Sequence, residues 1–206
     1  MTAFDDPTGT WNQRFAADGY LFGTEPNAWL REHAAVWQAG QRVLCVADGE
    51  GRNSVWLAER GLRVDAFDIA EAGVAKARRL AVQRGVAVDF PVADCDAFAW
   101  PRSAYDGVAA IFIQFADPAL RERLFHRIVD SLKPGGTLLL QGYTPKQLEY
   151  GTGGPPLIEH LYTPAMLREA FGALDIIELR EYEAELAEGS AHRGRSALIG
   201  LVARQR

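Results

Sequence analysis

From Arg42 onward the chain alternates short apolar runs with segments of helical periodicity, and this alternation restricts the fold more than any other feature of the sequence. Strands that are joined by helices pair in parallel, because each helix carries the chain back across the sheet. The run 108–113 is apolar at every position, which is typical of a strand covered on both faces. The pattern predicts strands at 43–47, 62–68, 86–92, 107–113 and 137–143, and helices at 53–60, 71–84, 118–132 and from Thr163 onward.

The end of the chain breaks this alternation. Two strand-like runs, 175–186 and 196–204, are joined by a glycine-containing loop with no helix between them, which predicts an antiparallel hairpin. The whole pattern predicts an α/β, Rossmann-like fold with a seven-stranded, mostly parallel sheet, a C-terminal antiparallel hairpin and helices on both faces.

No linker, repeat or low-complexity segment divides the 206 residues, so we expect a single domain, 1–206. Residues 1–41 would form an N-terminal cap, and 42–206 a cofactor-binding core with a glycine-rich lid segment at 144–162. The formal net charge of −5 argues against nucleic acid or an anionic membrane as a partner. The acidic start, which has no apolar run, and the presence of only two cysteines, Cys45 and Cys95, predict a cytoplasmic location.

A glycine-containing turn follows the first predicted strand. Residues 48–54 read Asp-Gly-Glu-Gly-Arg-Asn-Ser and lead into a helix, so backbone groups can approach a ligand closely there. The second predicted strand ends at Asp68, where a carboxylate can accept hydrogen bonds from both hydroxyls of a ribose. This pairing predicts a cofactor that contains a nucleoside. A tight turn and a helix cap would explain the same residues without a ligand.

Further motifs narrow the choice of cofactor. They are Asp94 after the third predicted strand, the turn Lys133-Pro134-Gly135-Gly136, the helix start Gly51-Arg52-Asn53-Ser54, and the opening Trp11-Asn12-Gln13-Arg14-Phe15 with Tyr20-Leu21-Phe22-Gly23-Thr24-Glu25-Pro26-Asn27. With these motifs the chain resembles the class I S-adenosylmethionine (SAM)-dependent methyltransferases. It is most similar to the subgroup of tellurite-resistance and thiol methyltransferases and their uncharacterised bacterial relatives. The resemblance covers essentially the whole chain and implies SAM as cofactor and S-adenosylhomocysteine (SAH) as product.

The resemblance also implies where each part of the cofactor binds. The turn 47–51 would lie against the methionine part, Asp68 would hold the ribose, and Asp94 with Cys95 would contact the adenine. Arg14 would pair with the cofactor's carboxylate, although a solvated arginine is an equal alternative. The predicted cofactor-binding residues are Arg14, Ala47, Asp48, Gly49, Glu50, Gly51, Asn53, Asp68, Ile69, Asp94, Cys95 and Ile111.

Two residues depart from the family pattern. Cys45 stands where the family usually has an acid, and Ala47 stands where it usually has the first glycine. The methyl group of Ala47 is tolerable in this turn if the φ angle is negative. Because a thiol cannot hold the cofactor's ammonium as a carboxylate does, we expect Asp48 or Glu50 to supply that charge.

The hairpin loop, 188–196, carries the residues that we expect at the methyl acceptor, because it is predicted at the ligand-binding edge of the sheet. His192 would act as a base or orient the nucleophile, since imidazole titrates near neutrality. The resemblance suggests that Arg193 holds an anionic acceptor, and Tyr143 is a third catalytic candidate at a strand end. The alternative for His192 is a solvent-exposed loop residue.

The sequence therefore predicts a SAM-dependent methyltransferase with a small-molecule acceptor: a thiol, a chalcogen oxyanion or a similar nucleophile. One alternative is a SAM-binding module without catalysis, which the departures at Cys45 and Ala47 suggest. Another is an NAD(P)-binding oxidoreductase, although Ser54 occupies a position that is normally Gly or Ala in that motif. The sequence lacks the usual hydrolase and zinc motifs, and no metal is predicted. We expect a monomer or a homodimer.

Overall fold

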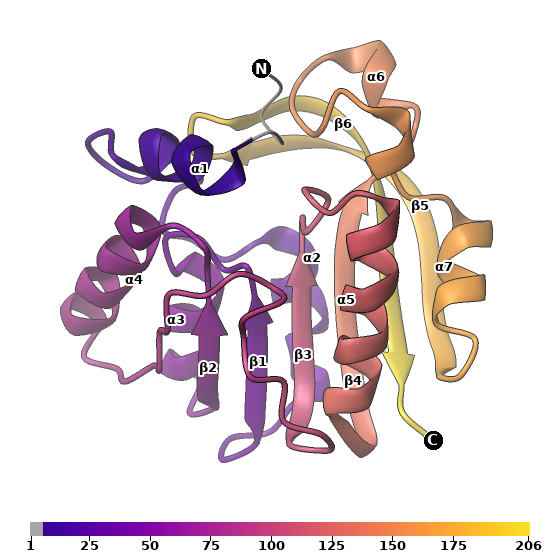
Figure 1. The fold of residues 1–206 in the computed structure, drawn as a ribbon, viewed down its shortest axis with the longest axis horizontal. Helices are drawn as coiled ribbons and strands as arrows, with labels where there is room; N and C mark the ends of the chain where they lie inside the picture. The colour runs from indigo at the N-terminus through magenta and orange to yellow at the C-terminus, as the bar shows by residue number, and fades with distance from the viewer. Residues whose placement is uncertain (1–5) are drawn as a thin grey trace. The chain divides into compact units, whose positions relative to one another are not determined.

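The computed structural model describes residues 6–206, which divide into two compact units. Unit 1 comprises Met1–Ala99 and Glu188–Ala191, and unit 2 comprises Trp100–Ala187 and His192–Arg206. Each unit combines strands with helices, which confirms the predicted α/β class (Figure 1). The prediction that 1–206 form a single domain stays a prediction.

Unit 1 contains the first two strand–helix repeats. These are β1 (Arg42–Val46), α3 (Arg52–Glu59), β2 (Arg63–Phe67) and α4 (Glu71–Arg84), preceded by α1 (Pro7–Phe15), α2 (Ala28–His33) and a short 3-10 helix (Ala34–Val36). β1 and β2 pair in parallel with Cys45 opposite Ala66, so both strands end at the same edge. The helix α4 occupies the predicted residues, and the other three elements differ from the prediction by one residue at each end.

The start of α3 depends on a glycine. Gly51, which precedes the helix, has a φ of +89°, a value that L side chains rarely adopt. A Cβ at Gly51 would also lie 2.7 Å from the Cβ of Ala77 on α4. The glycine therefore allows both the tight turn after β1 and the close approach of the turn to α4.

The helix α1 docks on the first turn of α4 (Figure 1). The residue before α4, Ala70, has no side chain that can cap the helix, and the Oδ1 of Asn12 accepts a hydrogen bond from the Ala72 N–H at 2.9 Å instead. The ring of Phe15 packs beside Gly73, where a Cβ would lie 2.9 Å from the Phe15 Cδ2. The two contacts fix the N-terminal helix against the element that follows Asp68.

Unit 2 carries the rest of the fold. Its elements are β3 (Tyr105–Ile111), α5 (Pro118–Ser131), β4 (Leu132–Tyr143), α6 (Gln147–Tyr150), a 3-10 helix (Ile158–His160), α7 (Pro164–Ala170), β5 (Asp175–Glu188) and β6 (His192–Arg204). The strand order within the unit is β3-β4-β6-β5, with β3 parallel to β4 and β4 antiparallel to β6. Asp117 caps α5 by accepting from the Leu120 N–H at 2.8 Å, and Leu124 and Ile128 bury its apolar stripe. These features confirm the helix predicted after β3, and two neighbouring strands end the chain, whereas the antiparallel hairpin itself stays a prediction.

The structure corrects the predicted number of strands. Residues 6–206 contain six strands, because 86–92 form only two isolated bridges, Asp65 with Asp89 and Asp68 with Val92. Pro91 has no N–H to donate, so this segment cannot complete a ladder, and although Phe90 is buried, Val92 is 47% exposed.

Three boundaries also differ from the prediction. The segment Lys133-Pro134-Gly135-Gly136 belongs to β4, since α5 ends at Ser131 and the strand begins at Leu132. The hairpin connection is only residues 189–191, which makes His192 the first residue of β6 rather than part of a long loop. The lid segment 144–162 was predicted without regular structure, yet it contains α6 and a 3-10 helix.

Within residues 6–206, no helix combines the length and the apolar character that a membrane span requires.

Candidate functional site

In unit 1 the glycine turn and Asp68 meet at the ends of β1 and β2. The carboxylate of Asp68 is 7% exposed, and its Oδ2 accepts from the Gly49 N–H at 2.9 Å. Its Oδ1 accepts from the Ala70 N–H at 2.9 Å. The Asp48 N–H donates to the Phe67 carbonyl at 3.0 Å. The acid predicted to hold a ribose thus also fixes the glycine turn to the neighbouring strand.

Two carboxyl groups at this turn have raised pKa values. Burial raises the pKa of Asp48 to about 7, against the opposing effect of the Ser54 hydroxyl, which donates to its Oδ2. Burial likewise raises the pKa of Asp68 to about 6, against the opposing effect of the N–H groups of Ala70 and Gly49. Both groups titrate near neutrality, so a cation bound at the turn would favour their ionised forms.

The φ angle of Ala47 is positive rather than negative. Its φ is +49°, in the left-handed region, whereas the sequence analysis allowed this alanine on the condition of a negative φ. An L residue in this region costs about 1–2 kcal/mol relative to the right-handed region. The strain arises because the chain turns sharply from β1 toward α3, a turn that a glycine would make without this cost.

Cys45 supplies no charge at the turn. Its side chain is 1% exposed, and burial, followed by the proximity of Asp48 and Asp65, raises the pKa of the thiol well above its ordinary value. The thiol is therefore neutral at physiological pH, so it does not supply the negative charge that an acid would carry at this position.

Glu50 has partners that the sequence did not predict. Its Oε1 lies 2.8 Å from the Nζ of Lys76, and its Oε2 accepts from the Leu21 N–H at 2.7 Å. Both carboxylate oxygens thus bind the protein itself. Of the two acids expected to replace the missing charge, Asp48 is the one that keeps partial exposure at the turn.

The other predicted cofactor residues occupy varied settings. Arg14 is exposed, with its Cζ 4.4 Å from the centroid of the Trp11 ring. Asn53 is buried, and its Oδ1 accepts from the Asn27 N–H at 2.9 Å. The exposed Asp94 accepts from the N–H groups of Asp96 and Ala97. Their roles toward a cofactor stay predictions, as do those of Gly49, Gly51, Ile69, Cys95 and Ile111.

Unit 2 brings two of the three predicted catalytic residues together. His192 is 8% exposed, and its ring centroid lies 4.5 Å from that of Phe112 and 5.9 Å from that of Tyr143. Phe112 stacks on Tyr143 with centroids 4.7 Å apart and has a φ of +55°, a rare value for an aromatic residue. The alternative of an exposed His192 is therefore wrong, whereas Arg193 is exposed.

Apolar side chains surround this aromatic group. Tyr143 clusters with Leu161, Leu186 and Leu198, and Phe112 packs against the same cluster. The nearby Gln114 side chain is used structurally, because it donates to the Tyr143 and His160 carbonyls and accepts from the Tyr143 N–H. A buried imidazole beside aromatic and aliphatic groups suits an uncharged partner better than a charged one.

The lid segment is tied to the hairpin. Gln147 accepts from the Ala197 N–H at 2.8 Å, and the Thr152 hydroxyl donates to the Arg195 carbonyl at 2.6 Å. On the surface, Glu183 of β5 lies between Lys146 and Arg195, and these two side chains hold the pKa of its carboxyl down at about 2.

Sequence reasoning missed Lys76, Asn12 and Glu188. Lys76 lies on α4, a helix whose charged residues otherwise suggest a solvated face, so its burial gives no signal in the sequence. Asn12 stands within a motif that carried the family resemblance, but its partner sixty residues away was not predicted. Glu188 contacts Arg52 at 2.8 Å, a pairing between residues that are distant in the sequence.

A glycine turn after β1, an acid after β2 and alternating strands and helices are typical of Rossmann-like folds. Residues 43–136 match the family model of the methyltransferase domain.

Among curated proteins, the chain is 35% identical to a demethylmenaquinone methyltransferase of Thermus thermophilus, over 54% of this chain and 51% of that protein. It is also 35% identical to a ubiquinone biosynthesis O-methyltransferase of Pseudomonas aeruginosa, over 54% and 47% of the two chains. The chain spans about half the length of these curated relatives.

Solved structures share the fold over nearly the whole chain. One was described in work on the conversion of a disulfide bond into a thioacetal group during echinomycin biosynthesis; it has a TM-score of 0.78 and 16% identity, and covers 98% of this chain and 91% of the other. TehB from Haemophilus influenzae has a TM-score of 0.71 and 16% identity, and covers 97% and 67%. At these identities the likeness concerns the fold.

Proposed function

We propose that this protein is a SAM-dependent methyltransferase and that its acceptor is a small, uncharged molecule with a thiol or hydroxyl group. The observation that carries the proposal is the turn 47–51 held by Asp68, in a segment that matches the methyltransferase domain family. The turn offers backbone groups and Asp48 to the methionine end of SAM, and Asp68 lies where the ribose is expected.

Methyl transfer from a sulfonium is an in-line displacement: the acceptor atom forms a bond to the methyl carbon while the carbon–sulfur bond of SAM breaks, leaving SAH. The protein mainly has to hold the two reactants and exclude water. His192 would take the proton that a thiol or hydroxyl loses as it attacks. Arg193 and Tyr143 stay candidates for orienting the acceptor.

The surroundings of His192 support an uncharged acceptor over a chalcogen oxyanion. Its ring packs against the aromatic rings of Phe112 and Tyr143, which lie among aliphatic side chains, and an oxyanion loses favourable hydration beside such apolar groups. Some relatives are named for quinone methylation and one similar structure for sulfur chemistry, which supports testing both hydroxylated rings and thiols.

Calorimetric titration with SAM, SAH and NADH tests cofactor choice. Binding of SAM and SAH without NADH binding is expected. NADH binding without SAM binding would overturn the proposal in favour of a dinucleotide enzyme.

Transfer of labelled methyl groups to thiols, hydroxylated aromatic rings, selenite and tellurite tests the acceptor. His192→Phe is the matched variant, because phenylalanine preserves the aromatic contacts with Phe112 and Tyr143 but cannot take a proton. It should lose turnover while keeping SAH affinity. Binding without turnover on the whole panel would favour the second candidate, a SAM-binding module without catalysis, which the departures at Cys45 and Ala47 suggest.

A further inference from the structure

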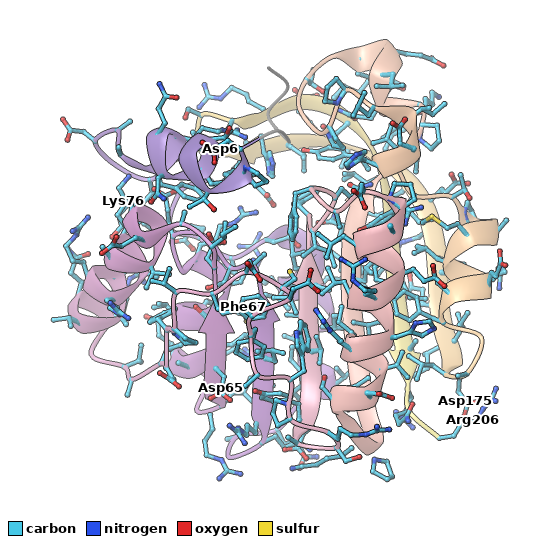
Figure 2. All side chains as sticks on the ribbon, viewed as in Figure 1. Asp6, Asp65, Phe67, Lys76, Asp175 and Arg206 are labelled. Carbon is cyan, nitrogen blue, oxygen red and sulfur yellow. The ribbon has the colours of Figure 1, made fainter. Side chains whose placement is uncertain are left out.

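In unit 1 a buried ion pair holds the segment that follows α1. Lys76 of α4 and Glu50 of the glycine turn are 8% and 3% exposed, and the Lys76 Nζ lies 2.8 Å from the Glu50 Oε1. The same ammonium donates to the carbonyls of Ala17 at 2.7 Å and Gly19 at 2.6 Å. Lys76, labelled in Figure 2, therefore has a partner for each of its three N–H donors. We call residues 17–23 the N-terminal strap.

The backbone of Leu21 connects this ion pair to the hairpin connection. Its N–H donates to the Glu50 Oε2 at 2.7 Å. Its carbonyl accepts from the N–H groups of Ser190 at 2.9 Å and Ala191 at 3.3 Å. One residue of the strap thus bonds the glycine turn on one side and, on the other, the two residues that precede His192 in the chain.

Glu188 and Gly189 strengthen the second of these contacts. Glu188 accepts from the Asn27 side chain at 3.1 Å and from the Ala28 N–H at 3.2 Å, and it pairs with Arg52. Gly189 has a φ of +65°, and a Cβ there would lie 2.3 Å from the Leu21 carbonyl oxygen. The hairpin connection and the strap therefore meet backbone to backbone, which fixes their separation closely.

Stability alone is a weak reason to bury such a pair. Removing two charges from water costs free energy that their attraction often only balances, and apolar residues of similar size commonly serve stability as well. Apolar side chains, however, cannot hold the carbonyls of Ala17 and Gly19 or the Leu21 N–H. The Lys76–Glu50 pair therefore fixes the position of the N-terminal strap beside the glycine turn.

We propose that Lys76 and Glu50 are positioning residues. They hold the N-terminal strap in the arrangement that binds the methionine end of SAM at the turn and that keeps residues 190–191 of the hairpin connection in place. This inference rests on the proposed function. Lys76 acts through Glu50 and the strap backbone rather than by touching the reacting atoms.

The test uses Lys76→Met, Glu50→Gln and the double variant in the full chain. Lys133→Met and Asp106→Asn serve as controls, because they break another lysine–carboxylate pair with a 2.9 Å contact, in unit 2. The measurements are urea stability, SAH affinity by calorimetry, and amide hydrogen exchange of peptides that cover 16–23 and 186–192.

Lys76→Met leaves a buried carboxylate without its cation, so it should lower both stability and SAH affinity. The double variant removes both charges and should recover stability, yet its SAH affinity should stay at least about tenfold below that of the unsubstituted protein, within the usual range of coupling between sites. Amide exchange at residues 21 and 190 should be faster. The controls should keep full SAH affinity. A purely structural pair would instead regain affinity together with stability.

The measurements distinguish failure of the proposed function from failure of the positioning role. If the unsubstituted protein binds neither SAM nor SAH, the proposed function fails, and the hydrogen-exchange arm still tests whether the pair orders the strap. If that protein binds SAH and the double variant matches it in affinity and in exchange, the positioning role is overturned. Should Lys76→Met fail to fold, the double variant decides the question in the same way.

Discussion

Of the two carboxyl groups with raised pKa values, Asp48 lies in the glycine turn, and Asp68, which follows β2, accepts a hydrogen bond from the turn at the Gly49 N–H. Asp48 is the less constrained of the two, because Ser54 alone supplies its hydrogen bonds, whereas the backbone of Gly49, Ile69 and Ala70 holds Asp68. In an apo protein its ionised form is unfavourable, and a cationic ligand would relieve that cost. The residue is therefore suited to sense whether the turn is occupied.

Asp48→Asn should change how stability depends on pH. The folded pKa of about 7 lies above the ordinary 3.8, so the contribution of Asp48 to stability is full at acidic pH and is lost as the pH rises toward 7. Asparagine keeps an acceptor for Ser54 and has no proton to lose. The difference in unfolding free energy, variant minus unsubstituted protein, should therefore be larger at pH 8 than at pH 5. We expect the two differences to differ by about 1–3 kcal/mol.

Urea denaturation at the two pH values measures this difference. Asp130→Asn, at an exposed carboxylate on α5, is the control and should show no such increase. A gain that is equal at both pH values would contradict the assignment of the raised pKa to Asp48.

Ala47→Gly should stabilise the protein by about 0.5–1 kcal/mol, because relief of the left-handed strain exceeds the extra backbone entropy of glycine in the unfolded chain. Ser103→Gly is the matched control, since Ser103 has a φ of +48° outside the turn. Both variants should gain stability in chemical denaturation, and only Ala47→Gly is expected to alter SAH affinity. A loss of stability in both would show that neither position is strained.

At the scale of elements, α1 contributes to the turn region because it is docked on α4. Asn12 caps the helix, Phe15 packs beside Gly73, and a Cβ at Gly49 would lie 3.1 Å from the Phe15 Cζ. The N-terminal helix thus touches both the glycine turn and the helix after Asp68. Its docking depends on the missing side chain at Gly73.

A double-mutant cycle tests this docking. Gly73→Ala alone should destabilise the protein, because the added Cβ would stand 2.9 Å from the Phe15 ring and 3.1 Å from the Gly49 carbonyl oxygen. In a Phe15→Ala background the same change should cost less or stabilise by up to about 1 kcal/mol, the helix propensity gained on replacing glycine. Thermal or urea denaturation of the four proteins gives the coupling free energy. Additive effects would mean that Phe15 and Gly73 are not in contact.

At the scale of the whole molecule, both cysteines lie in unit 1, and they are 1% and 5% exposed. Labelling of native thiols by a disulfide reagent therefore reports the opening of that unit and not of unit 2. SAH at a hundred times its dissociation constant should slow labelling by up to about a hundredfold, because it binds the closed form. Labelling in urea gives the control rate for the exposed thiols. A labelling rate that SAH leaves unchanged, in a protein shown to bind it, would place the cofactor outside unit 1.

Much of the fold could be predicted from the sequence, because its information is local. The helix α4 and the start of α5 follow from periodicity and capping residues, and the last two strands from two extended runs without a helix between them. The segment 86–92 was wrongly predicted as a strand. Its apolar residues satisfy the pattern, but Pro91 and the exposure of Val92 prevent a continuous ladder.

The candidate site was predictable only in part. Asp68 and the glycines were found because turn chemistry is visible in one stretch of sequence. The partners of Glu50, the sign of the Ala47 φ angle and the burial of His192 depend on how distant segments pack. A charged residue such as Lys76, on a helix with other charged residues, gives no sign in the sequence that it is enclosed.

The bridge made by Leu21 uses main-chain atoms alone, and this has a consequence for comparing homologous sequences. Any amino acid except proline can supply the same N–H and carbonyl, so an alignment column at this position is free to drift while the contact persists. Selection would instead act on Glu50, Lys76 and Gly189, three separate columns that share no local motif. A search for covarying pairs would therefore detect the columns of Glu50, Lys76 and Gly189 and would not detect Leu21.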